Sequence, residues 1–293
     1  MNCITNKPIF VIGTGRSGST VFFDILAKHP NVVWLSSLAR NYPRHPVLNS
    51  LLMHLRSLSL MDRILGGRFA PSEAYPFWDL NCPGFSNPYR DLRGEDVTPA
   101  AAVRIREAFG RMGTPTRHRV VAKITGWPRV RYLREIFPGA LFIEVQREPC
   151  ATASSLLEVA FWDGWRAAPG WRRGPLPPDL DALWRQENES FVALAAIEYV
   201  IVQRALADCR TALPSDQMHA VSYSRLCADP VGVFRDVTKF CGLDWSARFE
   251  KSIRRVRLMN RDDKWRSDLT AHQQAVLQRT LEQAQALKNS RTC

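Results

Sequence analysis

Short apolar runs alternate along the chain with segments whose apolar positions recur at helical spacing. The apolar runs are rich in β-branched residues and predict buried strands over 8–13, 119–124, 140–146 and 218–226. Strands separated by helices predict an α/β fold with a parallel sheet and right-handed crossovers, in which ligands bind at the carboxyl ends of the strands. The expected helices run from Ser19 to before Pro30, over about 97–111, 130–137, the stretch after Pro149, 187–208, 230–241 and 269–288.

Two segments, 34–96 and 162–186, do not follow this alternation. They are rich in Trp, Pro and Arg, and long irregular segments inside a compact domain usually form lids or binding walls. The length of 293 residues and the hydrophobic content of 45% suffice for the core of one large domain, so we expect a single domain over 1–293 with these segments as insertions.

The composition favours an anionic small ligand over a nucleic acid. The net charge of +12 comes mainly from 33 arginines, which suit bidentate recognition of sulfate, phosphate or carboxylate, although a GC-rich genome would give the same bias. The basic residues form no tail, stripe or recognition helix, so nucleic-acid binding is not expected. No stretch is long and apolar enough for a membrane span, and seven scattered cysteines favour a reducing, cytoplasmic location.

The first apolar run leads into GTGRSGST, residues 13–20, with the spacing Gly-x4-Gly-x-Thr of a phosphate-binding loop. Its glycines allow a tight turn that exposes backbone N–H groups, and a helix opening at Ser19 adds its positive dipole end. This pattern predicts an anion site. Ser19 stands where such loops carry the lysine that manages phosphate charge together with magnesium, which argues against a kinase or an ATPase. Arg16 is the cation that remains.

The segment GTGRSGSTVFFDILAKHPNV resembles the first signature of the sulfotransferases that use 3′-phosphoadenosine 5′-phosphosulfate (PAPS), especially the tyrosylprotein and bacterial carbohydrate branch. The resemblance covers 8–30, 119–160 and 218–285, and implies the sulfotransferase fold, a P-loop-type parallel sheet flanked by helices. A sulfuryl group carries less charge than a γ-phosphate, so no metal is expected. The resemblance implies that the 5′-phosphosulfate is bound by Gly15, Arg16, Ser17, Gly18, Ser19 and Thr20.

Three other segments extend the resemblance to the rest of the nucleotide site. FIEVQREPCATASSLLEV resembles the 3′-phosphate motif, which implies that Arg147 and Ser155 bind this phosphate. The alternative for Arg147 is a salt bridge with Glu148 or Glu144. SYSRLCADPVGVF resembles a segment that contributes Tyr223, and NRDDKWRSDL resembles a closing loop whose Lys264 and Trp265 contact the nucleotide, although Trp265 could instead cover the core.

Sulfuryl transfer to a hydroxyl requires a base for the acceptor proton and cations for the charge that develops on oxygen. Lys123, at the end of a predicted strand, matches a family lysine implicated in stabilising the transferring group, and Arg16 would share that role. The family's glutamate after the loop has no counterpart here, since WLSSLARN offers only Ser36 and Ser37. The remaining carboxylates considered as bases are Glu73, Asp79, Glu158 and Asp163.

We choose Glu73 because it stands among aromatic residues, where loss of hydration makes a carboxylate a stronger base; the alternative is a solvated loop carboxylate. His29 is interpreted as a structural cation at a helix C-terminus. The sequence therefore predicts a PAPS-dependent sulfotransferase that acts on a small-molecule, glycan or glycolipid hydroxyl and releases adenosine 3′,5′-bisphosphate. The alternatives are a small-molecule kinase and a nucleotide- or polyanion-binding module without turnover.

Overall fold

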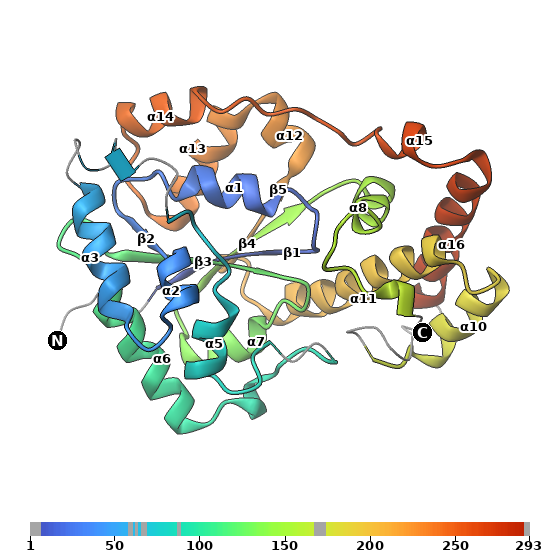
Figure 1. Ribbon diagram of the computed structural model, residues 1–293, viewed down its shortest axis with the longest axis horizontal. Coiled ribbons are helices and arrows are strands. Elements are labelled where there is room, and N and C mark those ends of the chain that lie inside the picture. Colours follow the sequence, from blue (N-terminus) through green and yellow to red (C-terminus); the bar gives the residue numbers. More distant parts are fainter. Residues whose placement is uncertain are drawn as a thin grey trace.

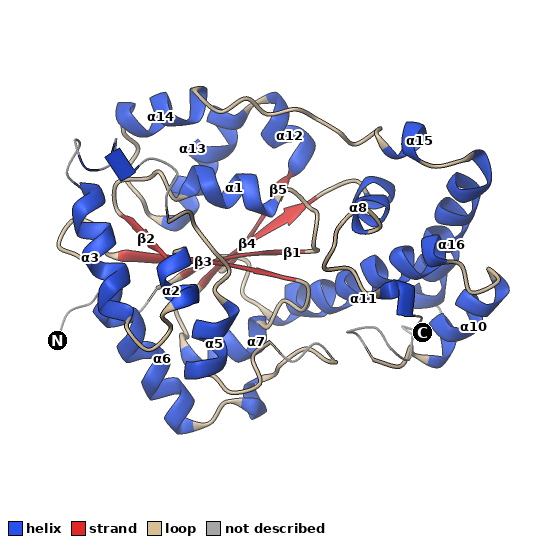
Figure 2. Cartoon of the chain, viewed as in Figure 1, coloured by secondary structure: helices blue, strands red, loops and turns tan. Residues whose placement is uncertain are grey.

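The described part of the chain is built on a five-stranded parallel sheet with the order β2-β3-β1-β4-β5 (Figure 2). The computed structural model describes residues 7–57, 61, 64–65, 69–86, 89–166 and 174–289. β1 is central and fully buried, and Val11 pairs with Lys123 on one side and with Ile143 on the other. The strands are β1 (Ile9–Gly13), β2 (Val32–Trp34), β3 (Arg119–Thr125), β4 (Leu141–Gln146) and β5 (Met218–Ser222).

Helices cover both faces of the sheet (Figure 1). α1 (Ser19–Leu26) lies on one face, and α6 (Pro99–Met112) and α7 (Val130–Ile136) lie on the other. Along the strand order, the connection from β1 to β2 runs in one direction, and the connections from β2 to β3 and from β3 to β4 run in the other. Right-handed crossovers therefore place α1 on one face of the sheet and α6 and α7 on the other. The other helices of the first half are α2 (Ser37–Asn41), α3 (Pro46–Ser57), α5 (Tyr75–Asn81) and the 3₁₀ turn η2 (Gly94–Asp96).

The second half of the chain adds a group of helices beside the carboxyl ends of the strands, where α8, α11 and α16 pack together (Figure 1). This group has its own apolar core, while the sheet and its flanking helices enclose the main one. No helix in the described ranges is long and apolar enough to cross a membrane. The elements are α8 (Pro149–Leu156), η3 (Gly164–Arg166), α10 (Pro178–Gln186), α11 (Phe191–Ala212), α12 (Tyr223–Ala228), α13 (Pro230–Cys241), α14 (Ala247–Arg254), α15 (Trp265–Asp268) and α16 (Ala271–Asn289).

The predicted parallel α/β fold is confirmed, and several boundaries are corrected. The strand predicted over 218–226 ends at Ser222, because the Ser222 hydroxyl accepts the Arg225 N–H and starts α12. The helix predicted over 187–208 begins only at Phe191, after the Ser190 cap, and continues to Ala212. The strand β2, three residues long, was missed because so short a run carries no period.

The prediction that 34–96 and 162–186 are irregular was wrong in part. The first holds α2, α3 and α5, and the second holds η3 and α10. The helix expected after Pro149 is shorter than its apolar pattern suggested and ends at Leu156. The helices in these segments pack mainly on other helices, α3 and α5 on α6, and α10 on α11 and α16. α2 and α5, at five and seven residues, are too short to show a period.

Candidate functional site

The loop between β1 and α1 is shaped to leave donors free. Gly18 has φ 87°, and a Cβ there would lie 2.2 Å from the ring of Tyr223, so this position requires glycine. α1 begins at Ser19 with no side-chain cap and no acidic residue in its first turn, which leaves its N–H groups available to an anion. The Ser17 hydroxyl is buried beside the loop and has no hydrogen-bond partner among the described residues. These features fit a bound phosphate or sulfate group.

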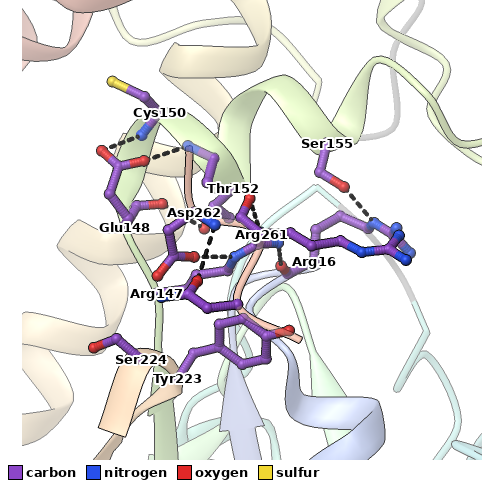
Figure 3. A network of polar contacts seen from close by, with 12 residues as sticks. Arg16, Arg147, Glu148, Cys150, Thr152, Ser155, Tyr223, Ser224, Arg261 and Asp262 are labelled. Carbon is purple, nitrogen blue, oxygen red and sulfur yellow. Dashed lines mark hydrogen bonds and ion pairs between the residues drawn. The ribbon is translucent and has the colours of Figure 1, made fainter. Parts of the chain in front are cut away.

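The predicted 3′-phosphate residues meet the loop in one polar network (Figure 3). Arg16 donates from Nε to Ser155 Oγ at 3.0 Å. Arg147, directly after β4, donates to the Arg16 carbonyl at 3.1 Å, and its Cζ lies 4.9 Å from the ring centroid of Tyr223. The structure therefore brings Arg16, Arg147, Ser155 and Tyr223 together from four separate elements.

Arg147 is already engaged by the segment that precedes α15. Its Nε pairs with Asp262 Oδ1 at 2.8 Å, and its Nη2 donates to the Arg261 carbonyl at 2.9 Å (Figure 3). The two alternative partners are used elsewhere: Glu148 caps α8, and Glu144 pairs with Arg210. Arg147 thus links the loop to residues 261–262, and a phosphate that uses Nε of Arg147 would compete with Asp262 for it.

Lys123 and Glu73 lie together at the other side of the loop. Lys123 is 8% exposed, and its Nζ lies 2.7 Å from Thr20 Oγ1 and 2.9 Å from Glu73 Oε1. Thr125 donates to the same Glu73 oxygen at 3.0 Å, and the Trp78 indole donates to the Glu73 carbonyl at 3.1 Å. The carboxylate that the sequence offered as a base is therefore held against the lysine at the end of β3, next to a loop hydroxyl.

A cleft of about 480 Å³ opens in front of the loop and is lined mainly by polar residues. Burial raises the pKa of the Asp24 carboxyl, which lies in this lining, and the positive charges of Lys123 and Lys28 oppose that shift. Cations outnumber carboxylates in the lining, which suits a polyanionic ligand. The cations are Arg16, Arg147, Arg257, Arg261 and Lys264, and the carboxylates are Asp24, Glu158 and Asp268.

The closing-loop residues Lys264 and Trp265 line the cleft, but their side chains contact other parts of the protein. Lys264 is exposed and pairs with Glu158 at 2.8 Å and with Asp268 at 2.5 Å. Trp265 is 3% exposed and belongs to the apolar core of the helical group, so covering the core is what its ring does here, with an edge at the cleft. Arg257 lines the cleft and was missed; the basic run RRVR that contains it was the only signal in the sequence.

Several other residues singled out in the sequence are held by contacts with residues outside the loop. Asp79 accepts hydrogen bonds from Ser86, and Glu158, although it lines the cleft, pairs with Lys264. Ser36 is the buried N-cap of α2. His29 is structural, as expected, but the interpretation as a cation is wrong: the ring is fully buried, and burial lowers its pKa. Its Nε2 lies 2.8 Å from the Asp244 carbonyl.

Residues 8–247 match the family described as Sulfotransferase family, and the chain belongs to this family of enzymes. A sequence comparison with curated proteins gives no match. Among solved structures, a sulfotransferase from Mycobacterium avium matches with a TM-score of 0.56 and 17% identity, over 95% of this chain and 76% of that one.

The sulfotransferase domain from the curacin biosynthetic pathway matches with a TM-score of 0.50 and 12% identity, over 93% of this chain and 96% of that one. A mouse sulfotransferase complexed with PAP matches with a TM-score of 0.46 and 10% identity, over 98% and 89%. At these identities the likeness to solved structures concerns the fold.

Proposed function

We propose that this enzyme transfers the sulfuryl group of PAPS to a hydroxyl group of a small molecule, glycan or glycolipid. The observation that carries the proposal is the arrangement at Thr20, where Lys123 contacts the anion loop and Glu73 lies against Lys123. A cation and a carboxylate at one loop hydroxyl provide the two groups that sulfuryl transfer requires. In this proposal the donor's 5′-phosphosulfate lies on residues 15–20, as the loop's free donors allow.

The 3′-phosphate of the donor would lie at Arg147 and Ser155, with Tyr223, Lys264 and Trp265 around the nucleotide. In this arrangement the phosphate would compete with Asp262 for the Nε of Arg147. Arg257, which also lines the cleft, adds a further cation for this end of the donor. The loop and the strand-end arginine also support placing the enzyme in the branch of the tyrosylprotein and bacterial carbohydrate sulfotransferases.

The proposed reaction is an in-line displacement at sulfur. The acceptor oxygen forms the new S–O bond, the bond from sulfur to the 5′-phosphate oxygen breaks, and the acceptor proton goes to Glu73. The contacts of Glu73 with Lys123 and Thr125 both use Oε1, so Oε2 is the oxygen we assign to the proton. Lys123 and Arg16 stabilise the negative charge on the transferring and leaving oxygens.

Family membership favours this reaction over phosphoryl transfer by a small-molecule kinase, and Ser19 in place of the loop lysine agrees with it. The buried Lys123–Glu73 pair favours catalysis over a binding module without turnover, because binding alone needs no carboxylate at the anion loop. We expect the enzyme to act in the cytoplasm, where its scattered thiols stay reduced.

The nucleotide assignment is tested by Arg147→Ala. Loss of a charged hydrogen bond to phosphate is expected to weaken binding of adenosine 3′,5′-bisphosphate about tenfold or more. Calorimetric titration measures this affinity, with Arg225→Ala, at an exposed arginine paired with Asp236, as the matched control. Unchanged affinity in Arg147→Ala would contradict the assignment. Transfer of labelled sulfate from PAPS to a set of hydroxyl acceptors then tests the reaction itself.

A further inference from the structure

Helix α3 is apolar on its outer face as well as on its inner face. Asn49, Leu52 and Met53 are buried against the rest of the fold. On the outside, Val47 is 63% and Leu51 is 56% exposed. At 100° per residue these two, with Leu48 and Leu55, which are also exposed, span an arc of about 100° on the outer side.

The stretch around α3 holds more of the exposed large apolar side chains than any other stretch of the described residues. Of the fourteen large hydrophobic residues that are exposed there, seven lie between Tyr42 and Phe69. Exposed apolar patches of this kind mark interaction sites. We call Val47, Leu48, Leu51 and Leu55 the α3 patch.

The α3 patch is held rigidly by the fold. Asn49, fully buried, donates from Nδ2 to the Trp34 carbonyl at 2.8 Å and accepts from the N–H and the hydroxyl of Ser36 at 3.0 and 2.6 Å. Ser36 also forms an antiparallel bridge with Pro71. The two ends of the segment that carries the patch are therefore joined to each other at Ser36 and Pro71, and Pro71 is two residues before Glu73.

The segment that carries the patch has charge of one sign over residues 36–61. From Ser36 to Met61 the sequence contains no Asp or Glu, while Arg40 and Arg44 are both exposed. A twofold contact between two copies of this chain would place the same patch and the same arginines opposite each other. Repulsion between the like charges of these arginines disfavours such a contact. An anionic lipid membrane is complementary to both parts of this surface, because its acyl chains can cover the apolar patch and its head groups can bind the arginines.

We propose that the α3 patch docks the protein on the surface of an anionic lipid membrane. Val47, Leu48, Leu51 and Leu55 enter the boundary between head groups and acyl chains, and Arg40 and Arg44 bind the lipid phosphates and carboxylates. The helix lies in the plane of the surface, since it does not span the membrane. The inference does not depend on the proposed reaction.

The full-length protein is sedimented with vesicles of phosphatidylcholine that contain about 30% phosphatidylserine. We expect binding that weakens about tenfold in Val47→Gln/Leu51→Gln, and about fivefold or more in Arg44→Glu. The matched controls are Phe191→Gln on α11 and Arg185→Glu on α10, both at exposed positions, which should bind like the wild type. α10 lies at the opposite end of the molecule from α3 (Figure 1). Raising the salt from about 0.1 M to about 0.5 M should release the wild type.

Two results would overturn the proposal. One is the absence of binding to anionic vesicles, or equal binding by the wild type and Val47→Gln/Leu51→Gln. The other is a dimer in analytical ultracentrifugation that this double variant dissociates, which would assign the patch to a second copy. Circular dichroism confirms that each variant is folded. Binding of adenosine 3′,5′-bisphosphate is measured in parallel, so that a failure of membrane docking is distinguished from a failure of the nucleotide assignment.

Discussion

Two regions of the molecule meet at the ion pair between Lys123 and Glu73, and they are held in place by different means. The anion loop and Lys123 belong to adjacent central strands, where Gly13 pairs with Thr125. Glu73 comes from the segment between β2 and α5, which is fixed by the Asn49 side-chain cluster and by one isolated backbone bridge from Ser36 to Pro71. A continuous backbone ladder therefore holds the anion loop and Lys123, the proposed donor side, whereas a polar side-chain cluster and a single bridge hold the segment of Glu73, the proposed acceptor side.

This difference indicates where each side tolerates change. A backbone ladder distributes its free energy over many hydrogen bonds, so that replacing a ligand-contacting side chain on the donor side should mainly affect binding and turnover, whereas a change at a loop glycine also strains the backbone. A buried polar cluster concentrates its free energy in a few atoms, and loss of one partner leaves others unsatisfied. Substitutions on the two sides should therefore differ in what they reduce: turnover on one side, stability on the other.

The largest effect is expected from Lys123→Met. Loss of the cation at the transferring group should lower turnover about 100-fold to 1000-fold. Affinity for adenosine 3′,5′-bisphosphate, which lacks the sulfuryl group, should change little. Steady-state kinetics and calorimetric titration separate the two quantities, and Lys239→Met, at an exposed site on α13, serves as the control. A loss of nucleotide affinity as large as the loss of turnover would remove Lys123 from the transfer step.

Asn49→Ala tests the acceptor side by removing the centre of its polar cluster. The Ser36 N–H and the Trp34 carbonyl would lose their buried partner, so the free energy of unfolding should fall by about 3 kcal/mol. Chemical denaturation measures the change. Asn31→Ala, which removes an exposed hydrogen bond to the Thr116 carbonyl, should cost much less. Equal costs at the two positions would show that the cluster does not hold the segment.

Gly18→Ala tests the donor side, where backbone conformation and a close approach coincide. Positive φ and the contact of the new Cβ with the Tyr223 ring should lower the free energy of unfolding by about 1–3 kcal/mol and weaken nucleotide binding. Gly84→Ala is a matched control, because Gly84 has φ 81° and no atom within 4 Å of the new Cβ. The smaller loss of unfolding free energy in Gly84→Ala gives the cost of positive φ alone. An equal loss in the two variants would mean that the Tyr223 ring moves aside at no cost.

The smallest effect is expected for Asp91→Asn, in the stretch between α5 and η2. Burial raises the pKa of the Asp91 carboxyl to about 6, so the folded state binds a proton that the unfolded state releases at lower pH. The free energy of unfolding should therefore fall as the pH rises from about 4 to about 6. Asn removes this penalty and should be more stable than the wild type at pH 7 by about 1 kcal/mol.

The control for Asp91 is Asp96→Asn, for which the opposite sign is expected. The Arg90 guanidinium lowers the pKa of the Asp96 carboxyl to about 2, so its contribution is present above the unfolded-state pKa and is lost as the pH falls. Asp96→Asn should therefore be less stable than the wild type at pH 7. Denaturation curves from pH 4 to pH 7 check both variants, and parallel curves for Asp91→Asn and the wild type would contradict the burial argument.

Most elements of the fold that are long enough to show a period were accessible from the sequence; α3, twelve residues long, was missed because apolar residues lie on its outer face as well as its inner face. The buried strands and α13 were predicted because burial on both faces leaves continuous apolar runs and because twelve residues display a helical face. β2 and α2, at three and five residues, were too short to show one. The protonation of His29 was predicted wrongly because it depends on how deeply the ring is buried. That burial depends on α14, whose Phe249 packs on the ring.

The sequence by itself determined the anion loop, because a tight turn after a strand and an uncapped helix start are local properties of residues 13–20. Only the tertiary structure decided which side chains face that loop. Lys123 meets Thr20 across 103 positions, and Arg147 meets Asp262 across 115. Such contacts follow from strand order and from the way the segments between strands fold back, and those depend on the packing of the whole chain.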